Sequence, residues 1–395
     1  MLFKIMFSRT LDVSKSTSSL FLFGPRMTGK TTLMQQIKAS RWYNLLDVEM
    51  ELQLAHNPKL FWQEIQDIPP KSTIIIDEIQ KLPLLLNYIQ MGIDQLHHRF
   101  IMSGSSARKL KRGSANLLGG RALDLRLHPL THQEIGKNFS IEFALQYGTL
   151  PKIMSLVFET SESKENDGDK IQEIKDSLHS YFTTYLKEEI QAEALTRSLI
   201  GFQRFLPIAA QANGDIIEYA NISSRCSVPM STVKEYFSIL EDTLIGHLLW
   251  PHDRSERKKA RPKFYLFDCG VARAIQNRLS DPPTPPEMGH LFEAWFYHEL
   301  KAMRDYQKKD HEFSLWRQGP HEIDFLVTGG RGPLLGIECK SGNTDPHVPS
   351  LKAFKNAFPK VPLLIASKNE TRSRKLSDDV SIVPWKEALA RYEEF

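Results

Sequence analysis

One short segment near the start of the chain limits the choice of fold more than any other. Residues 24–31, GPRMTGKT, match the pattern G-x-x-x-x-G-K-[ST]. They follow the apolar run Leu20–Phe23 and open an expected helix over Thr31–Ile37, which is the strand, loop and helix order of a phosphate-binding loop. Glycines let backbone N–H groups wrap a phosphate, and the helix dipole favours the anion. The sequence therefore predicts an α/β domain that binds ATP.

The residues of this loop have separate expected roles. Lys30 is expected to reach the β and γ phosphates, and the Thr31 hydroxyl to ligate Mg²⁺. The alternative is a flexible glycine turn, which the flanking strand and helix disfavour. The predicted nucleotide-binding residues of the loop are Gly24, Pro25, Arg26, Met27, Thr28, Gly29, Lys30, Thr31 and Thr32.

Two further segments fit the same domain. Residues 72–78, STIIIDE, read as a buried strand that ends in two carboxylates. Asp77 is expected to hold Mg²⁺ through its water shell, and Glu78 to polarise the attacking water. The alternative is a strand followed by an exposed acidic turn. The run Phe100–Ser103 resembles a third strand, and Ser103 or Ser105 at its end is a candidate sensor of the γ-phosphate. The alternative is an ordinary Ser-Gly-Ser-Ser turn.

Two arginines are candidates for stabilising charge during hydrolysis. Arg121 follows Gly119-Gly120, and Arg126 lies five residues further on. If one of them is presented to a neighbouring subunit, hydrolysis requires a homo-oligomer. The alternative is an ordinary surface arginine.

Length and composition set the wider limits. The 395 residues are too many for one core, so several domains are expected. Hydrophobic residues make up 41% of the chain and charged ones 25%, as in soluble globular proteins. The 3 cysteines lie far apart, which suits a reducing cytosol. The apolar start, Met1–Phe7, is shorter than a signal segment and no 18-residue apolar run follows, so we expect a cytoplasmic protein without a membrane partner.

The pattern along the chain divides it into three α/β and helical parts. We predict an ATPase domain over residues 1–157 and a polar linker over 158–170, because residues 159–170, ETSESKENDGDK, have no large apolar side chain. A helical and winged-helix domain over 171–280 and a second α/β domain over 281–395 follow, separated by the proline-rich run DPPTPP.

The middle part has the element order of a winged helix. A short helix over Asn221–Cys226 and a longer helix over Ser231–Asp242, with Ser231 as its N-cap, precede strands over Ile245–Trp250 and Phe264–Phe267. Residues 253–263 between these strands carry a charge of +4 from six basic and two acidic side chains, equal to the formal net charge of the whole protein. A basic wing is suited to a DNA backbone. The alternative is a solvated charge run on a winged helix used for protein contacts. The predicted DNA-binding residues are Lys234, Arg254, Arg257, Lys258, Lys259, Arg261 and Lys263.

Carboxylates gather in the last part of the sequence. Glu293 lies on an expected helix, Asp324 on a strand, and Glu338 at the end of the next strand. Alternate residues of a strand share a face, so Glu338 and Lys340 point together. Asp324 can then meet Glu338 across the ladder, which gives hard oxygen ligands for Mg²⁺ or Mn²⁺, while Lys340 can orient an attacking water. Glu322 shares the face of Asp324. The alternative is a structural ion pair of Lys340 with a neighbouring carboxylate.

Taken together, these segments resemble a prokaryotic family of AAA-superfamily ATPases in which a P-loop domain is joined to a winged helix and a PD-(D/E)xK nuclease-like domain. The segments that carry the resemblance are 24–32 (GPRMTGKTT), 74–80 (IIIDEIQ), 119–121, 181–190, 263–271 (KFYLFDCGV), 289–293 (GHLFE), 316–327 and 337–340. The resemblance implies ATP binding and this three-part fold. It also implies a candidate nuclease cluster of Glu293, Asp324, Glu338 and Lys340.

The leading hypothesis is an ATP-hydrolysing protein that binds DNA through its winged helix and cuts it at the carboxylate cluster. The alternative is a nucleotide-controlled ATPase that binds or remodels DNA or a protein, with a nuclease fold that is not catalytic. A third reading is a regulatory switch that uses its winged helix for protein contacts.

Overall fold

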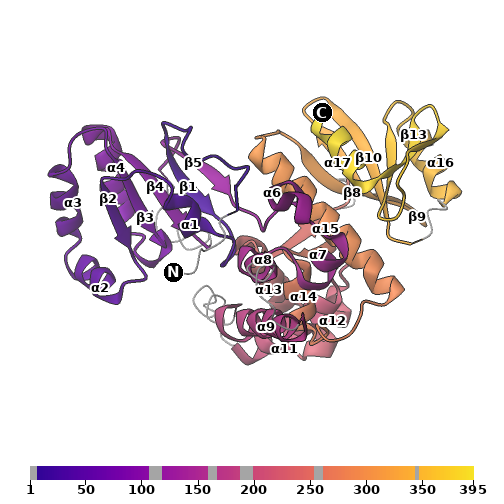
Figure 1. The fold of residues 1–395 in the computed structure, drawn as a ribbon, viewed down its shortest axis with the longest axis horizontal. Helices are drawn as coiled ribbons and strands as arrows, with labels where there is room; N and C mark the ends of the chain where they lie inside the picture. The colour runs from indigo at the N-terminus through magenta and orange to yellow at the C-terminus, as the bar shows by residue number, and fades with distance from the viewer. Residues whose placement is uncertain (1–6, 106–117, 159–166, 187–198, 253–260, 343–346) are drawn as a thin grey trace.

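Three groups of elements follow one another along the chain, and Figure 1 shows the first and last of them at opposite ends of the molecule. The computed structural model describes residues 7–105, 118–158, 167–186, 199–252, 261–342 and 347–395. No described helix combines the length and apolarity that crossing a bilayer demands.

The first group is a five-stranded sheet in the order β2-β3-β4-β1-β5, and all its strand pairs are parallel. Its central strands are continuous apolar runs, because helices cover both faces of a parallel sheet. The strands are β1 (Ser19–Phe23), β2 (Arg41–Asn44), β3 (Thr73–Asp77), β4 (Arg99–Gly104) and β5 (Ala122–Arg126). The helices are α1 (Lys30–Met34), α2 (Val48–His56), α3 (Pro58–Gln66) and α4 (Leu85–Leu96), with a short 3-10 turn over Ile79–Lys81.

The second group is mainly helical and holds one antiparallel hairpin, in which Gly246 pairs with Leu266 and Leu249 with Lys263. Its helices are α6 (His132–Ile135), α7 (Ile141–Tyr147), α8 (Pro151–Phe158), α9 (Asp167–Ser180), α11 (Leu199–Gln211), α12 (Tyr219–Cys226), α13 (Met230–Asp242) and α14 (Cys269–Ile275). A 3-10 turn over Gly136–Asn138 and a π-helix over Tyr181–Leu186 complete it. The hairpin strands are β6 (Gly246–Leu249) and β7 (Lys263–Leu266).

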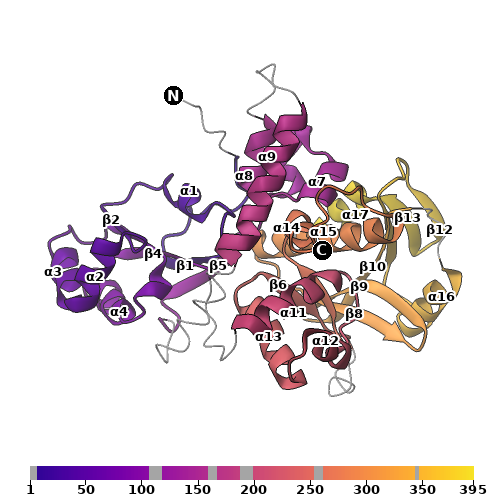
Figure 2. The same ribbon diagram turned by 90° about the horizontal axis from the view of Figure 1, so that it is seen from below.

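The third group is a six-stranded mixed sheet in the order β12-β13-β11-β10-β9-β8, together with three helices. Helix α15 (Pro285–Tyr306) contacts β10, α7, α14 and β5, so it joins this sheet to both other groups (Figure 2). The strands are β8 (Glu312–Gln318), β9 (His321–Gly329), β10 (Gly332–Lys340), β11 (Leu363–Ser367), β12 (Arg374–Ser377) and β13 (Val380–Pro384). The other helices are α16 (Val348–Ala357) and α17 (Trp385–Glu393).

Several local expectations differ from the structure. Helix α13 begins at Met230 with Pro229 as its N-cap, so Ser231 is not the cap. The proline run does not only separate domains, because Pro285 and Pro286 occupy the first turn of α15, where proline needs no N–H partner. Residues 167–170 of the expected linker form the start of α9, and residues 159–166 lie outside the described part of the chain.

The cores do not follow the predicted boundary at residue 157. Tyr147, Leu150 and Ile153 pack in one core with the helices of the second group. Ile141 and Leu145 of α7 pack with α15 and the six-stranded sheet. The division into 1–157, 158–170, 171–280 and 281–395 stays a prediction, and the packing favours counting α7 and α8 with the second group.

Candidate functional site

The phosphate-binding loop lies between β1 and α1, at the carboxyl end of the parallel sheet. Gly29 has a φ of 93° and Met27 a φ of 63°, so the loop turns through left-handed backbone at two positions. A side chain at Gly24 would place its Cβ 2.4 Å from the carbonyl oxygen of Leu127. Glycine at position 24 therefore lets the chain after β5 pack directly against the loop.

Lys30 is folded back onto its own loop. Its ammonium donates to the carbonyl oxygens of Gly24 at 2.7 Å and Pro25 at 3.1 Å, and only 6% of the residue is exposed. The loop is thus closed around the lysine that is expected to meet phosphate. Contact with a triphosphate requires Lys30 to exchange these carbonyls for phosphate oxygens.

The predicted Mg²⁺ ligands lie next to each other. The Thr31 hydroxyl donates to the Asp77 carboxylate at 2.8 Å, which joins α1 to the end of β3. Ser103 at the end of β4 donates to the other Asp77 oxygen and accepts from the Glu78 backbone N–H at 3.0 Å. A hydroxyl beside a carboxylate at the mouth of a phosphate loop is a donor set that suits Mg²⁺. The residues present therefore fit this ion.

Two further residues contact this site: Gln80, which lies in the segment 74–80 but has no role assigned from the sequence, and Arg9, which lies in none of the motifs. Gln80 donates to the Glu78 carboxylate and, at 3.2 Å, to the Ser105 hydroxyl, so it holds the side chain expected to orient water. Its position two residues after the acidic pair is the signal that could have found it. Arg9 donates to the carbonyls of Thr28 at 3.1 Å and His128 at 2.6 Å. No motif marks Arg9, because its partners are distant in sequence.

Other residues of the loop have structural contacts. The Thr28 hydroxyl donates to the Pro25 carbonyl at 2.9 Å, and the Arg26 carbonyl accepts from the Tyr181 hydroxyl at 3.4 Å. Thr32 is half-buried in the first turn of α1. These contacts fix the loop from within and from the second group of elements.

The two arginine candidates lie at opposite ends of β5. Arg121 precedes the strand, beside the start of β1, and pairs with Asp94 at 2.8 Å on the surface. It is therefore at the end of the sheet away from the loop of its own chain. Arg126 pairs in register with Phe23, directly before the loop. The structure thus brings Arg126, and not Arg121, to the nucleotide end of the sheet.

The helices α12 and α13 and the hairpin β6–β7 have the order expected of a winged helix. Lys234 is exposed on α13, with its ammonium 5.4 Å from the ring centre of Tyr219. Arg261 is also exposed and pairs with Glu218. Four of the predicted DNA-binding residues lie outside the described residues: Arg254, Arg257, Lys258 and Lys259.

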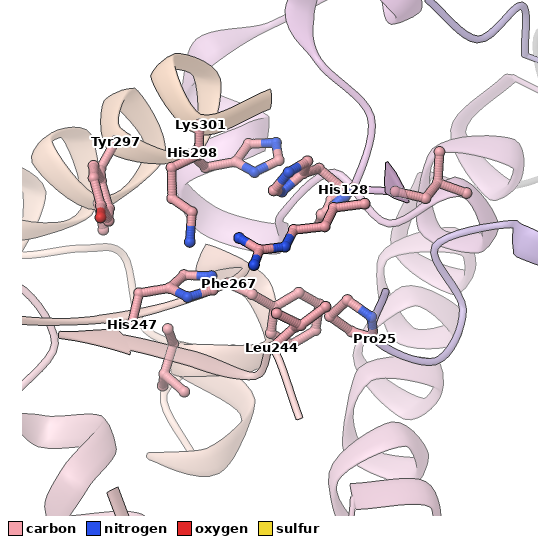
Figure 3. Close-up of a pocket in the computed structure, with 13 residues that line it drawn as sticks. Pro25, His128, Leu244, His247, Phe267, Tyr297, His298 and Lys301 are labelled. Atoms are coloured by element: carbon pink, nitrogen blue, oxygen red, sulfur yellow. The ribbon is translucent and has the colours of Figure 1, made fainter. Parts of the chain in front are cut away.

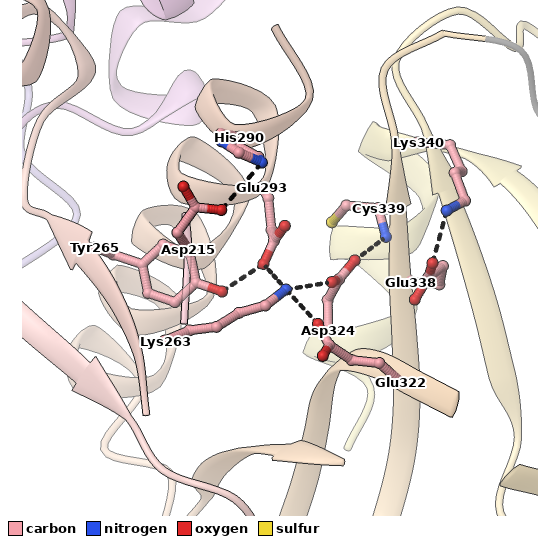
Figure 4. Close-up of polar contacts among 10 residues, drawn as sticks. All are labelled: Asp215, Lys263, Tyr265, His290, Glu293, Glu322, Asp324, Glu338, Cys339 and Lys340. Carbon is pink, nitrogen blue, oxygen red and sulfur yellow. Dashed lines mark hydrogen bonds and ion pairs between the residues drawn. The ribbon is translucent and has the colours of Figure 1, made fainter. Parts of the chain in front are cut away.

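Lys263 was expected to contact a DNA backbone, but the structure places it in a buried position. Its ammonium is buried among three carboxylates, 2.7 Å from Glu293, 2.8 Å from Glu322 and 2.9 Å from Asp324 (Figure 4). The cause is the register of the hairpin, in which β7 runs beside α15 and β9. The prediction for Lys263 is corrected to a buried ion-pair partner.

The predicted metal ligands converge only in part. Glu293 and Asp324 share Lys263, whereas Glu338 pairs with Lys340 at 2.7 Å. Asp324 also accepts from the Cys339 backbone N–H at 2.8 Å, which is how β9 holds it against β10. Among the described residues no group of three or more His, Cys, Asp or Glu is arranged to hold a metal ion. The oxygen ligands suit Mg²⁺ or Mn²⁺ chemically, but Lys263 already supplies the cation.

Burial and the charges of neighbouring groups shift the pKa values of the residues in this cluster. Burial, followed by the Asp324 charge, raises the pKa of Glu293 to about 8. The same two causes, in the same order, raise the pKa of Glu338 to about 7. The pKa of Lys263 is raised well above its usual range by Asp324, Glu293 and Glu322, although burial, the largest single influence, opposes this. The cluster therefore stabilises a cation at its centre.

Comparison with known protein families supports an AAA-type fold for the first group of elements. A family model described as an AAA domain matches residues 16–136, and two domains of unknown function, DUF8612 and DUF4143, match 161–281 and 288–388. An uncharacterized protein of Haemophilus influenzae is 24% identical over 281 residues, which cover 63% of this chain and 67% of that protein.

Solved structures were also found. The Aeropyrum pernix ORC1 protein in complex with DNA is 14% identical over 67% of this chain and 87% of its own, with a TM-score of 0.34. The replication initiator DnaA bound to AMPPCP and single-stranded DNA is 14% identical over 63% of this chain and 86% of its own, with a TM-score of 0.31. These two likenesses are weak and carry no conclusion. The AAA family model over residues 16–136 and the parallel sheet together show a multidomain α/β protein whose first part is an AAA-type P-loop domain.

Proposed function

We propose that this protein binds and hydrolyses ATP at the loop between β1 and α1. The observation that carries the proposal is the contact of Thr31 with Asp77, beside Lys30 and within an AAA-type domain. These three residue types serve phosphate and Mg²⁺ binding in P-loop ATPases.

Each side chain has a defined part in the proposed reaction. Lys30 leaves the Gly24 and Pro25 carbonyls and binds the β and γ phosphates. Thr31 and Asp77 would hold Mg²⁺, which neutralises charge on the phosphates when it is bound. Glu78, which accepts a hydrogen bond from Gln80, orients the attacking water. Ser103 donates to the Asp77 carboxylate and so fixes its orientation.

A steady-state ATPase assay tests this proposal. We expect Lys30→Ala to lower turnover by about 100-fold or more, because it removes a cation aimed at the charge that develops on phosphate. Lys38→Ala is the matched control, since Lys38 is exposed just beyond α1. Equal turnover by Lys30→Ala and the control would show that the loop is not the hydrolytic site.

The proposed macromolecular partner is DNA, bound through the winged helix. The support is the order α12, α13, β6 and β7, the exposed Lys234 and Arg261, and the basic composition of residues 253–263. The alternative is a protein partner for the same surface. Salt-dependent affinity for DNA distinguishes the two, since counterion release belongs to phosphate contacts.

For the C-terminal part, we propose that it binds DNA or a protein partner and does not cleave DNA. Lys263 fills the space among Glu293, Glu322 and Asp324, so a divalent ion and this ammonium cannot share the cluster. Metal-dependent cleavage by Asp324, Glu338 and Lys340 is the second candidate, and it requires Lys263 to leave the carboxylates.

We also propose that Arg121 acts at the ATP site of a neighbouring subunit. The dependence of ATP turnover on protein concentration tests this role.

A further inference from the structure

A cavity lies where the three groups of elements meet, lined by residues of β5, β6 and α15. It is narrow: the space inside it for the centre of a water molecule is about 20 Å³, within about 420 Å³ of empty space that includes its opening to solvent. Its walls include Pro25 of the phosphate-binding loop, Arg126 and His128 at the end of β5, His247 of β6, and Tyr297 and Lys301 of α15 (Figure 3). Four of these six side chains are basic.

Lys301 is buried in the cavity wall, where its charge is not matched by a paired carboxylate. Only 6% of the residue is exposed, and its ammonium is aimed into the cavity (Figure 3). The ammonium lies 5.5 Å from the centre of the Tyr297 ring. Within the described part of the chain, neither Lys301 nor Arg126 makes a hydrogen bond or an ion pair through its side chain.

The nearby carboxylates are already engaged. Asp305 pairs with His128 at 2.7 Å and with Arg304 at 2.6 Å. Glu241 accepts from the Leu248 backbone N–H at 3.3 Å. Burial, and next the charge of Arg304, hold the pKa of Lys301 well below its usual range. These surroundings favour the neutral amine of Lys301, and an anion bound beside it would favour the charged ammonium.

We propose that this cavity is a binding site for a small tetrahedral oxoanion of the inorganic phosphate type, separate from the P-loop. Arg126 of β5 offers a planar fork of donors, Lys301 of α15 an ammonium and His247 of β6 an imidazole, so the three donors come from three different elements. Donors from three directions suit a tetrahedral anion better than a planar carboxylate. A DNA backbone does not fit, because Lys301 is enclosed and duplex DNA cannot enter.

The position gives such an anion a structural consequence. It would contact the strand that ends beside the P-loop, the wing hairpin and α15 at once. An occupied site therefore links the ATPase domain to the two parts that follow. This inference does not rest on ATP hydrolysis, and the two can fail separately.

Calorimetric titration of the full chain with inorganic phosphate tests the proposal. The P-loop is first filled with Mg²⁺ and a non-hydrolysable ATP analogue, so that phosphate cannot bind there. We expect saturable binding to one site, weakened about tenfold or more by Lys301→Met and by Arg126→Gln, because each removes a charged donor. Lys352→Met and Arg331→Gln, exposed and remote from the cavity, are the matched controls and should bind as the wild type does.

Two results would overturn the site. One is no saturable binding by the wild type with a filled P-loop, and the other is unchanged binding by both cavity variants. The same titration in Lys30→Ala without nucleotide separates the sites: retained binding supports the cavity, and abolished binding assigns the phosphate to the P-loop. A thermal melt of Lys301→Met tests whether this variant is folded. Arg126→Gln changes an exposed residue, so it provides a second variant whose fold is not at risk.

Discussion

At the scale of single residues, Lys263 shows how burial changes the meaning of a charge. Its place at the end of a basic segment predicts a phosphate contact, because sequence alone shows neighbours only along the chain. Its true neighbours, Glu293 and Asp324, are 30 and 61 residues away and meet it only after β7 packs beside α15 and β9. By contrast, Lys30, Thr31 and Asp77 were predictable, because a local motif fixes each of them.

Replacement of this lysine tests the account of the carboxylate cluster. Lys263→Met leaves Glu293, Glu322 and Asp324 facing one another without a cation. We expect a loss of about 3–5 kcal/mol in the free energy of unfolding, the usual cost of removing one partner from a buried ion pair. Mn²⁺ should restore much of this stability in the variant and have little effect on the wild type, as measured by thermal unfolding.

The exposed Lys375→Met serves as the control. An equal effect of Mn²⁺ on Lys263→Met and the wild type would contradict the claim that the ammonium occupies the place of a divalent ion. If Lys263→Met also cuts DNA with Mn²⁺, this result favours metal-dependent cleavage by the C-terminal part over binding without cleavage. If it binds Mn²⁺ but does not cut, the binding role is the better account.

At the scale of elements, most strands and helices were predictable because their patterns are local. The apolar runs of β1, β3 and β4 and the alternation in β9 and β10 give their positions to within a few residues. The start of α13 was not predictable in detail, because Ser231 and Pro229 both suit the beginning of a helix. The hairpin β6–β7 was predictable, whereas the side of β7 that faces α15 was not.

The wing is the element whose proposed role is tested most simply. The triple variant Arg257→Ala, Lys258→Ala and Lys259→Ala should bind DNA more weakly, because it removes three positive charges from the segment between β6 and β7. Its plot of log affinity against log salt should flatten by about 0.9 for each DNA phosphate that the variant no longer neutralises. Fluorescence anisotropy with labelled duplex measures both quantities.

The control removes three exposed lysines elsewhere: Lys59, Lys352 and Lys375. It makes the same change in net charge. If the two triple variants have the same salt dependence as the wild type, the wing does not contact phosphates, and the protein-binding alternative for this surface is favoured.

At the scale of the whole molecule, the division into three parts stays a prediction, and the packing between the parts was not predictable from the sequence. Composition placed a boundary at residue 157, whereas Tyr147 and Ile153 belong to the core of the helical group. The cavity around Lys301 was equally out of reach, since its walls come from all three parts and no motif joins them. Contacts between residues that are distant in the sequence form only when the whole chain has folded, so short sequence patterns do not reveal them.

The central claim is that the first part of the chain hydrolyses ATP with Lys30, Thr31, Asp77 and Glu78. Phosphate release at saturating ATP by Glu78→Gln tests it most directly, because this variant keeps the size of the side chain and its contact with Gln80 while it removes the charge that orients water. We expect turnover about 100-fold or more below that of the wild type, with ATP affinity nearly unchanged. Turnover equal to the wild type would contradict it.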